Sequence, residues 1–154
     1  MINLKNKFPI IILRFFLVYG PTQNNQRLVP FVINSCLKNK KFYLTSGYQK
    51  RDFLFIDDAV ESIFLAINNK KAIGKIINVS SGNPVSVRSI VNLILKKIKK
   101  GEPIFNSINS LKYENKSLYG NISRAKSILK WRPKFTLDDG LDITISFYKK
   151  IKDE

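Results

Sequence analysis

The chain has 154 residues with 44% hydrophobic and 12% aromatic content, which is enough apolar material for one folded domain. It contains one cysteine, Cys36, and no histidine, which excludes an internal disulfide, a zinc site of cysteines and histidines, and histidine acid–base chemistry. The apolar run from residue 8 to 19 is interrupted by Arg14 and is too short for a bilayer span, so we expect a cytoplasmic protein without membrane contact.

The net charge of +16, from 27 basic and 11 acidic residues, has two interpretations. Such a basic excess is typical of proteins that bind nucleic acid or anionic membranes. Most of these basic residues are lysines at the ends and on the polar faces of expected helices, and lysine, asparagine and isoleucine are all abundant, as codon bias in an AT-rich genome would produce. Basic motifs interleaved with aromatic residues are absent, so we favour the compositional explanation and expect no nucleic-acid partner.

The first elements follow from apolar patterning. Residues 9–16 form a continuous β-branched and aromatic run, which predicts a strand buried on both faces of a parallel sheet. Gly20 and Pro21 then turn the chain, and apolar residues at helical spacing predict a helix over 27–39 with Pro30 in its first turn.

Strands and helices continue to alternate. Short strands are expected at 40–45 and 53–56, followed by a helix over 57–69 whose free N–H groups would be capped by Asp57 and Asp58. This alternation is typical of an α/β fold.

The second half of the chain continues the pattern. We expect a buried strand at 75–80 and possible strand structure at 103–105, with residues 106–120 as a loop. Ser86 is expected to cap an amphipathic helix, Ser123 a short helix, and Thr136 with Asp139 the last helix.

Two arginines stand beside apolar strands. Arg51 precedes the strand at 53–56, where its fork of donors is suited to a planar anion such as phosphate; alternatively it pairs with Asp52 or Asp57 and only fixes the corner. Arg14 lies inside an apolar run and must either be paired or reach the surface, because an unpaired buried charge is costly. We expect Asp52 or Asp58 to be its neighbour.

Five segments, in order, resemble one family. Residues 13–21 are similar to Arg-x-x-Asn-x-Tyr-Gly-Pro, 49–58 to Arg-Asp-Phe-x-x-Val-x-Asp, and 77–82 to Tyr-Asn-Ile-Gly-Ser-Gly. Residues 123–133 are similar to Ser-Lys-Ala-Lys followed by Leu-Gly-Trp-x-Pro, and 139–148 to the family's last helix. The chain therefore resembles the C-terminal part of an extended short-chain dehydrogenase/reductase, in the NAD-dependent epimerase/dehydratase family that acts on nucleotide sugars.

The resemblance implies a partial domain. The end of a Rossmann sheet would lie at about 8–20 and a substrate-binding region at about 21–154, with the larger part of the Rossmann half absent. Family members use NAD or NADP, held by a glycine-rich loop, and a Tyr-x-x-x-Lys pair that transfers a proton. Neither feature occurs in its expected place, so we expect this chain alone to be inactive and not to bind the cofactor.

The resemblance also implies a substrate site for a nucleotide-diphosphate sugar. Arg51 matches the arginine that contacts the pyrophosphate. Arg27 and Leu28 lie where the family's loop approaches the diphosphate and the sugar. Phe42 and Leu44 belong to the strand that flanks the base.

The resemblance also implies roles for other positions. Leu17 and Val18 lie where the family's chain runs beside the nicotinamide of the cofactor, although Leu17 replaces an asparagine that commonly forms a hydrogen bond with substrate. Residues 111–114 faintly resemble a Pro-Tyr-Arg-x-x-Glu stretch of CDP-sugar reductases, without its arginine. Trp131 is expected to pack in the core, and Tyr19 against the Rossmann half.

Three functions are carried forward. The first is the nucleotide-sugar-binding region of an NAD-dependent epimerase, dehydratase or 4-ketoreductase of surface-polysaccharide synthesis. The second is a stand-alone remnant that binds nucleotide sugar or docks onto a separate Rossmann chain, with a homodimer as the other possible assembly. The third is a basic nucleic-acid-binding module. We also expect the strands at 9–16 and 75–79 to expose apolar edges that favour aggregation or pairing.

Overall fold

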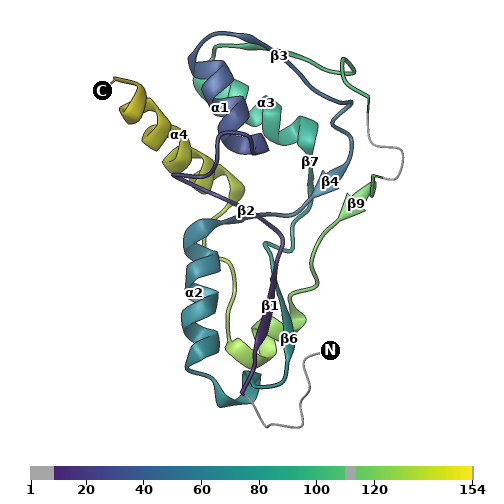
Figure 1. Ribbon diagram of the computed structural model, residues 1–154, viewed down its shortest axis with the longest axis vertical. Helices are drawn as coiled ribbons and strands as arrows, with labels where there is room; N and C mark the ends of the chain where they lie inside the picture. Colours follow the sequence, from purple (N-terminus) through teal and green to yellow (C-terminus); the bar gives the residue numbers. More distant parts are fainter. Residues whose placement is uncertain (1–8, 110–113, 154) are drawn as a thin grey trace.

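The computed structural model describes residues 9–109 and 114–153. Strands and helices alternate along most of the chain, which confirms the α/β class (Figure 1). The elements are β1 (Ile12–Phe15), β2 (Leu17–Tyr19), α1 (Leu28–Leu37), β3 (Lys41–Tyr43), β4 (Lys50–Arg51), β5 (Phe53–Phe55), α2 (Ile56–Ile67), the 3₁₀ turn η2 (Lys70–Ala72), β6 (Ile76–Val79), β7 (Val85–Ser86), α3 (Val87–Ile98), β8 (Glu102–Ile104), β9 (Ser117–Leu118), the π-helix η3 (Ala125–Leu129) and α4 (Leu137–Asp153).

The strands form short, mostly parallel pairs. β1 pairs with β6, β2 with β5, and β3 with β8, all parallel. β4 lies between β7, which is antiparallel to it, and β9, which is parallel. The expected loop at 106–120 therefore contains a strand, β9, that its low apolar periodicity did not indicate.

The run at 9–16 is not one strand buried on both faces, so that prediction was wrong. β1 ends at Phe15, and the chain then changes partner from β6 to β5. Ile12 is 46% exposed and Phe15 38% exposed, because β1 has a strand on one side only among the described residues.

Two of the predicted helix caps are confirmed. The Ser86 hydroxyl accepts a hydrogen bond from the Ser89 amide at 3.0 Å and starts α3. Thr136 and Asp139 form a reciprocal capping box in front of α4: the Asp139 amide donates to Thr136 Oγ1, and the Thr136 amide donates to Asp139 Oδ2, each at 3.2 Å.

The other two predicted caps were wrong. α2 begins at Ile56 and has no side-chain cap. The carboxylate of Asp58 instead accepts from the amides of Lys134 and Phe135, at 2.8 and 3.2 Å, and thereby ties α2 to a distant segment. The short helix η3 has no side-chain cap either, and the Ser123 amide in front of it donates to the Asn121 side chain.

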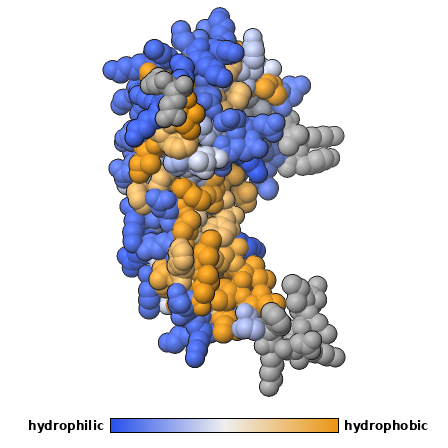
Figure 2. Space-filling model, turned by 60° about the vertical axis from the view of Figure 1, so that its left-hand side comes forward, coloured by the Kyte–Doolittle hydropathy of each residue, from blue (hydrophilic) through white to orange (hydrophobic). Residues whose placement is uncertain are grey.

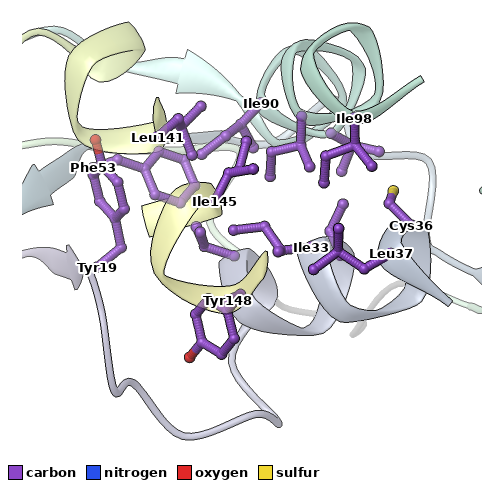
Figure 3. Close-up of a cluster of buried hydrophobic side chains, with 14 of the residues drawn as sticks. Tyr19, Ile33, Cys36, Leu37, Phe53, Ile90, Ile98, Leu141, Ile145 and Tyr148 are labelled. Atoms are coloured by element: carbon purple, nitrogen blue, oxygen red, sulfur yellow. The ribbon is translucent and has the colours of Figure 1, made fainter. Parts of the chain in front are cut away.

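The apolar core has two parts. The larger lies between α1, α3 and α4, in the upper half of Figure 1, and Figure 3 shows its side chains facing one another. Tyr19 belongs to it: this residue is 2% exposed, its ring lies edge-on to Phe53 and Phe55, and its hydroxyl donates to the Leu137 carbonyl at 3.3 Å. Tyr19 is therefore already packed within this chain, contrary to the prediction that it awaits a Rossmann half.

The smaller part of the core lies between α2, β6 and η3. Trp131 is 1% exposed there, and its indole N–H donates to the Asp58 carbonyl at 3.0 Å, which confirms a packing role. The helices in the described part of the chain include none that is both long and apolar enough to cross a membrane.

Candidate functional site

The corner between β4 and β5 is organised by a buried carboxylate. Asp52 is 0% exposed, and its Oδ1 accepts from the amide and the hydroxyl of Ser81, at 2.7 and 2.6 Å. Its Oδ2 accepts from the amides of Gly82 and Gly120, at 3.1 and 3.2 Å. One side chain thus joins the corner to the turn after β6 and to the segment after β9.

Arg51 is held by backbone and by one acid. Its Nη1 donates to the carbonyls of Lys50 and Asn115, both at 2.8 Å, and its Nη2 pairs with Glu114 at 2.7 Å. The predicted partners Asp52 and Asp57 were wrong, because Asp52 is occupied by amides and a hydroxyl. Residues 111–113 of the CDP-sugar-reductase-like stretch lie outside the described residues.

A groove of about 360 Å³ opens beside Arg51. Arg14 lines it as well, with Nε donating to Asn78 Oδ1 at 3.0 Å. Arg14 is exposed, as one of the two expectations for it required, and Asp52 lines the same groove. Its hydrogen-bond partner is Asn78, and among the described residues neither Asp52 nor Asp58 forms an ion pair with it. The groove therefore combines two arginines, Asp52 and Asn78 with an apolar wall of Phe15, Phe16, Leu17 and Leu118.

A second groove, of about 520 Å³, lies at the N-terminus of α1. It brings together four of the sequence-predicted positions: Leu17, Val18, Arg27 and Leu28. Arg27 is the N-cap residue, with an exposed side chain and no side-chain capping bond. The free amides and dipole of a helix N-terminus attract anions, and an exposed guanidinium beside them adds to that attraction.

The two grooves meet at Phe16 and Leu17, which line both. Leu17 is 39% exposed there. The sequence-predicted arginines are therefore divided between two grooves that share a wall, Arg27 in one and Arg51 in the other.

The groove at α1 also contains a residue that the sequence did not single out, Gln23. Its Nε2 donates to the Val18 carbonyl at 2.7 Å. Its Oε1 is buried and has no hydrogen-bond partner in the described part of the chain. A buried acceptor without a partner is unusual, and in a groove it is suited to a ligand hydroxyl or a water. The polar loop after Gly20–Pro21 was its only signal in the sequence.

Phe42 and Leu44 lie elsewhere. Their side chains belong to the larger core and are 3% and 8% exposed, and they line neither groove. Between them, Tyr43 is 57% exposed, so it is the side chain of this segment that an external group would contact. The contact of this strand with a base stays a prediction.

A Tyr-x-x-x-Lys spacing does occur near the end of the chain, at Tyr148 and Lys152, and it is structural. The Tyr148 hydroxyl donates to the Gln23 carbonyl at 2.8 Å, and Lys152 Nζ donates to the Leu37 carbonyl at 2.7 Å. Burial raises the pKa of Tyr148, which is the opposite of what a proton-transferring tyrosine needs.

Comparison with known proteins gives one family. Residues 2–80 match the family model described as the NAD dependent epimerase/dehydratase family. A protein of Bacillus subtilis, described as an uncharacterized UDP-glucose epimerase, is 31% identical over 93% of this chain and 45% of its own length. Human dTDP-D-glucose 4,6-dehydratase is 31% identical over 94% of this chain and 43% of its own.

Solved structures agree in fold and in extent. The UDP-glucuronic acid 4-epimerase of Bacillus cereus, crystallised with UDP-glucuronic acid and NAD, superposes with a TM-score of 0.87 at 31% identity. The match covers 96% of this chain and 47% of that one. The chain thus spans about half the length of the relatives it matches.

Proposed function

Because this chain belongs to the NAD dependent epimerase/dehydratase family, we propose that it forms the nucleotide-sugar-binding part of a sugar-nucleotide epimerase, dehydratase or reductase. The observation that carries the proposal is the pair of grooves sharing Phe16 and Leu17, with Arg27 in one and Arg14 and Arg51 in the other. A diphosphate ester presents several anionic oxygens along a short chain, and guanidinium groups bind such oxygens in pairs.

Arg27 and Arg51 differ in how their side chains are held, and we assign them different roles on that basis. Arg27 has an exposed side chain beside a helix N-terminus, so it is ready to receive phosphate. Arg51 already pairs with Glu114, and its guanidinium is fixed in direction by two carbonyls. We assign initial capture of the diphosphate to Arg27, and orientation to the preorganised Arg51.

The nicotinamide cofactor of the family finds only a partial fit in this chain. Leu17 offers an exposed apolar contact for a ring, whereas Val18 is half-buried and its carbonyl is taken by Gln23. No Gly-x-x-Gly-x-x-Gly segment is present in the sequence to hold a dinucleotide phosphate. We therefore assign no reaction step to these residues and propose that the chain alone binds sugar nucleotide without turning it over.

The single, buried Cys36 suits the cytoplasm in which we place it.

The test is a binding titration of the chain with UDP-glucose, UDP-glucuronic acid and uridine, followed by amide NMR shifts. We expect the two diphosphates to bind and uridine to bind more weakly, with shifts around Leu17, Arg27 and Arg51. Arg27→Ala should weaken binding roughly 10- to 100-fold, since a charge-assisted hydrogen bond contributes about 1.5–3 kcal/mol.

Arg132→Ala is the matched control, because Arg132 is also exposed and lines neither groove. An equal loss of affinity in the two variants would mean that only the net charge of the chain matters, and it would contradict a binding site at α1. Failure of all three compounds to bind the folded chain would contradict the proposed function itself.

A further inference from the structure

The segment between β3 and β4 passes close to the first turn of α3 (Figure 1). The Arg88 amide donates to the Gly47 carbonyl at 2.8 Å, and the Arg88 Nε donates to the Ser46 carbonyl at 3.2 Å. A Cβ on Gly47, where φ is +73°, would lie 3.1 Å from the amide nitrogen of Arg88, so this close approach requires glycine. One arginine of α3 thus binds the segment through both its backbone and its side chain.

The guanidinium of Arg88 also lies over two aromatic rings. Its Cζ is 4.0 Å from the ring centroid of Phe105, which follows β8, and 5.0 Å from that of Tyr48, in the segment before β4. Tyr48 is 68% exposed, and no other ring within residues 9–109 and 114–153 stacks on it. The extended hydrophobic surface in Figure 2 covers the lower half of the molecule, whereas the upper half, which holds α3, is mainly hydrophilic on the face shown. A planar, delocalised guanidinium is well suited to fix such an exposed ring.

The same segment leads directly into the arginine of the candidate site. The Val87 amide donates to the Gln49 carbonyl at 3.1 Å, and β4 then runs antiparallel to β7, which immediately precedes α3. The Nη1 of Arg51 donates to the Lys50 carbonyl at 2.8 Å, so the direction of this guanidinium depends on where the backbone of β4 lies. That backbone continues the segment that Arg88 holds.

Phe105 connects Arg88 with the strand that is predicted to flank the base. β8 ends one residue before Phe105 and pairs in parallel with β3, and the Leu44 amide donates to the Ile104 carbonyl at 3.0 Å. Arg88 therefore contacts the continuation of two segments, the one that carries Arg51 and the one beside β3.

We propose that Arg88 is a positioning residue of the nucleotide-diphosphate site, an inference that rests on the proposed function. Its guanidinium holds the segment before β4 against α3 and so keeps Arg51 directed at the diphosphate. Arg88 lines neither groove, so it acts through Arg51 and does not touch the ligand. It also lies outside the two cores, in which Val87 and Ile90 anchor α3, so its replacement should leave the fold intact.

The test replaces Arg88 with lysine, which preserves the net charge but has no planar group to stack on the two rings. The full chain is titrated with UDP-glucuronic acid, and the Nε–Hε NMR signal of Arg51 is followed in the free protein. We expect Arg88→Lys to bind about tenfold more weakly, which is the combined scale of two such stacking contacts, and the Arg51 signal to shift and broaden. Urea unfolding checks that the variant is fully folded.

Arg124→Lys is the matched control, because Arg124 also donates to a backbone carbonyl, that of Ile76 at 3.1 Å, and lines neither groove. It should change neither the affinity nor the Arg51 signal. Tyr48→Ala should reproduce the loss of affinity, whereas Tyr48→Phe keeps the ring and should retain the affinity.

A double-mutant cycle measures whether Arg88 acts through Arg51. In a chain that already carries Arg51→Ala, Arg88→Lys should cost little further affinity, and additive losses would overturn the proposal. An unchanged affinity or an unchanged Arg51 signal in Arg88→Lys, or an equal loss in Arg124→Lys, would also overturn it. If the wild-type chain binds no UDP-glucuronic acid, the proposed function fails, and the Arg51 signal still decides whether Arg88 positions that side chain.

Discussion

Replacing Asp52 with asparagine tests whether the corner in front of the candidate site depends on one buried carboxylate. Both oxygens of Asp52 accept hydrogen bonds, Oδ1 from Ser81 and Oδ2 from the amides of Gly82 and Gly120. All of these partners are donors. An asparagine amide in either orientation would turn its own NH₂ group toward two of them and leave those two without an acceptor.

The expected cost follows from this count. A hydrogen bond to a charged acceptor contributes about 1.5–3 kcal/mol, so losing the two at one oxygen should lower the free energy of unfolding by about 3–6 kcal/mol. That is a large share of the roughly 5–15 kcal/mol typical of a folded domain. The assay is urea unfolding followed by circular dichroism.

Asp57→Asn is the matched control, because Asp57 is exposed in the first turn of α2, where its charge favours the helix dipole, and it forms no ion pair with the described residues. We expect that variant to cost less than about 1 kcal/mol. If Asp52→Asn costs within about 0.5 kcal/mol of this control, the carboxylate does not hold the three segments together and the reasoning fails.

Two further predictions concern single side chains. Desolvation raises the pKa of Asp58 from its ordinary 3.8, although two backbone hydrogen bonds oppose the shift, whereas hydrogen bonds from Thr136 lower the pKa of Asp139. A carboxyl NMR titration should therefore place the two midpoints on opposite sides of 3.8. Asp139 therefore adds to the free energy of unfolding, and this contribution is lost as the pH falls through its lowered folded pKa. The ionised Asp58 lowers the free energy of unfolding, and this loss is relieved as the pH falls through its raised folded pKa. Coincident midpoints would contradict both statements. At Gly140, alanine would ordinarily favour a helix by up to about 1 kcal/mol, but an added Cβ would overlap the Tyr19 hydroxyl, so Gly140→Ala should destabilise the protein by about 1–3 kcal/mol. Tyr19→Phe in the same chain should recover part of this loss, and additivity in the double-mutant cycle would argue against the overlap.

The sequence predicted best where the signal and its effect are adjacent. Ser86 and Ser89 are three residues apart, as are Thr136 and Asp139, and both contacts form as the capping rules require. Pro30 lies in the first turn of α1, where its missing N–H costs nothing. Each of these features is decided within one turn of chain, so tertiary packing leaves it unchanged.

Predictions about partners of charged groups failed because the partners are remote. Asp58 looks like a helix cap in the sequence, yet its acceptors are used by the amides of Lys134 and Phe135. Arg51 looks like the partner of an adjacent aspartate, yet it pairs with Glu114. In each case the sequence offers a neighbouring partner, but the group instead bonds to backbone amides or to an acid far along the chain. Only the tertiary fold determines which remote groups come that close.

In the run from residue 9 to residue 19, hydrophobic periodicity cannot predict where one strand ends and the next begins. All of these residues except Arg14 are apolar or aromatic, so nothing marks the point at which the backbone leaves one partner strand for another. The Phe16 amide still donates to the Val79 backbone carbonyl, whereas the Leu17 amide donates to the Asp52 backbone carbonyl. Because β6 and β5 belong to different pairs, the chain separates two grooves at this step, and Leu17 stands exposed between them.

Leu17 therefore lies on the wall between the two grooves and is not a core residue. A leucine can donate no hydrogen bond, so a ligand that bridges the two grooves must cross an apolar side chain and take its polar contacts on either side. On one side these are Arg27 and the Gln23 Oε1 atom, which has no partner among the described residues, and on the other side Arg14 and Arg51. For the proposed function, selectivity among sugar nucleotides should therefore depend on how a ligand spans Leu17, with phosphate affinity supplied by the arginines.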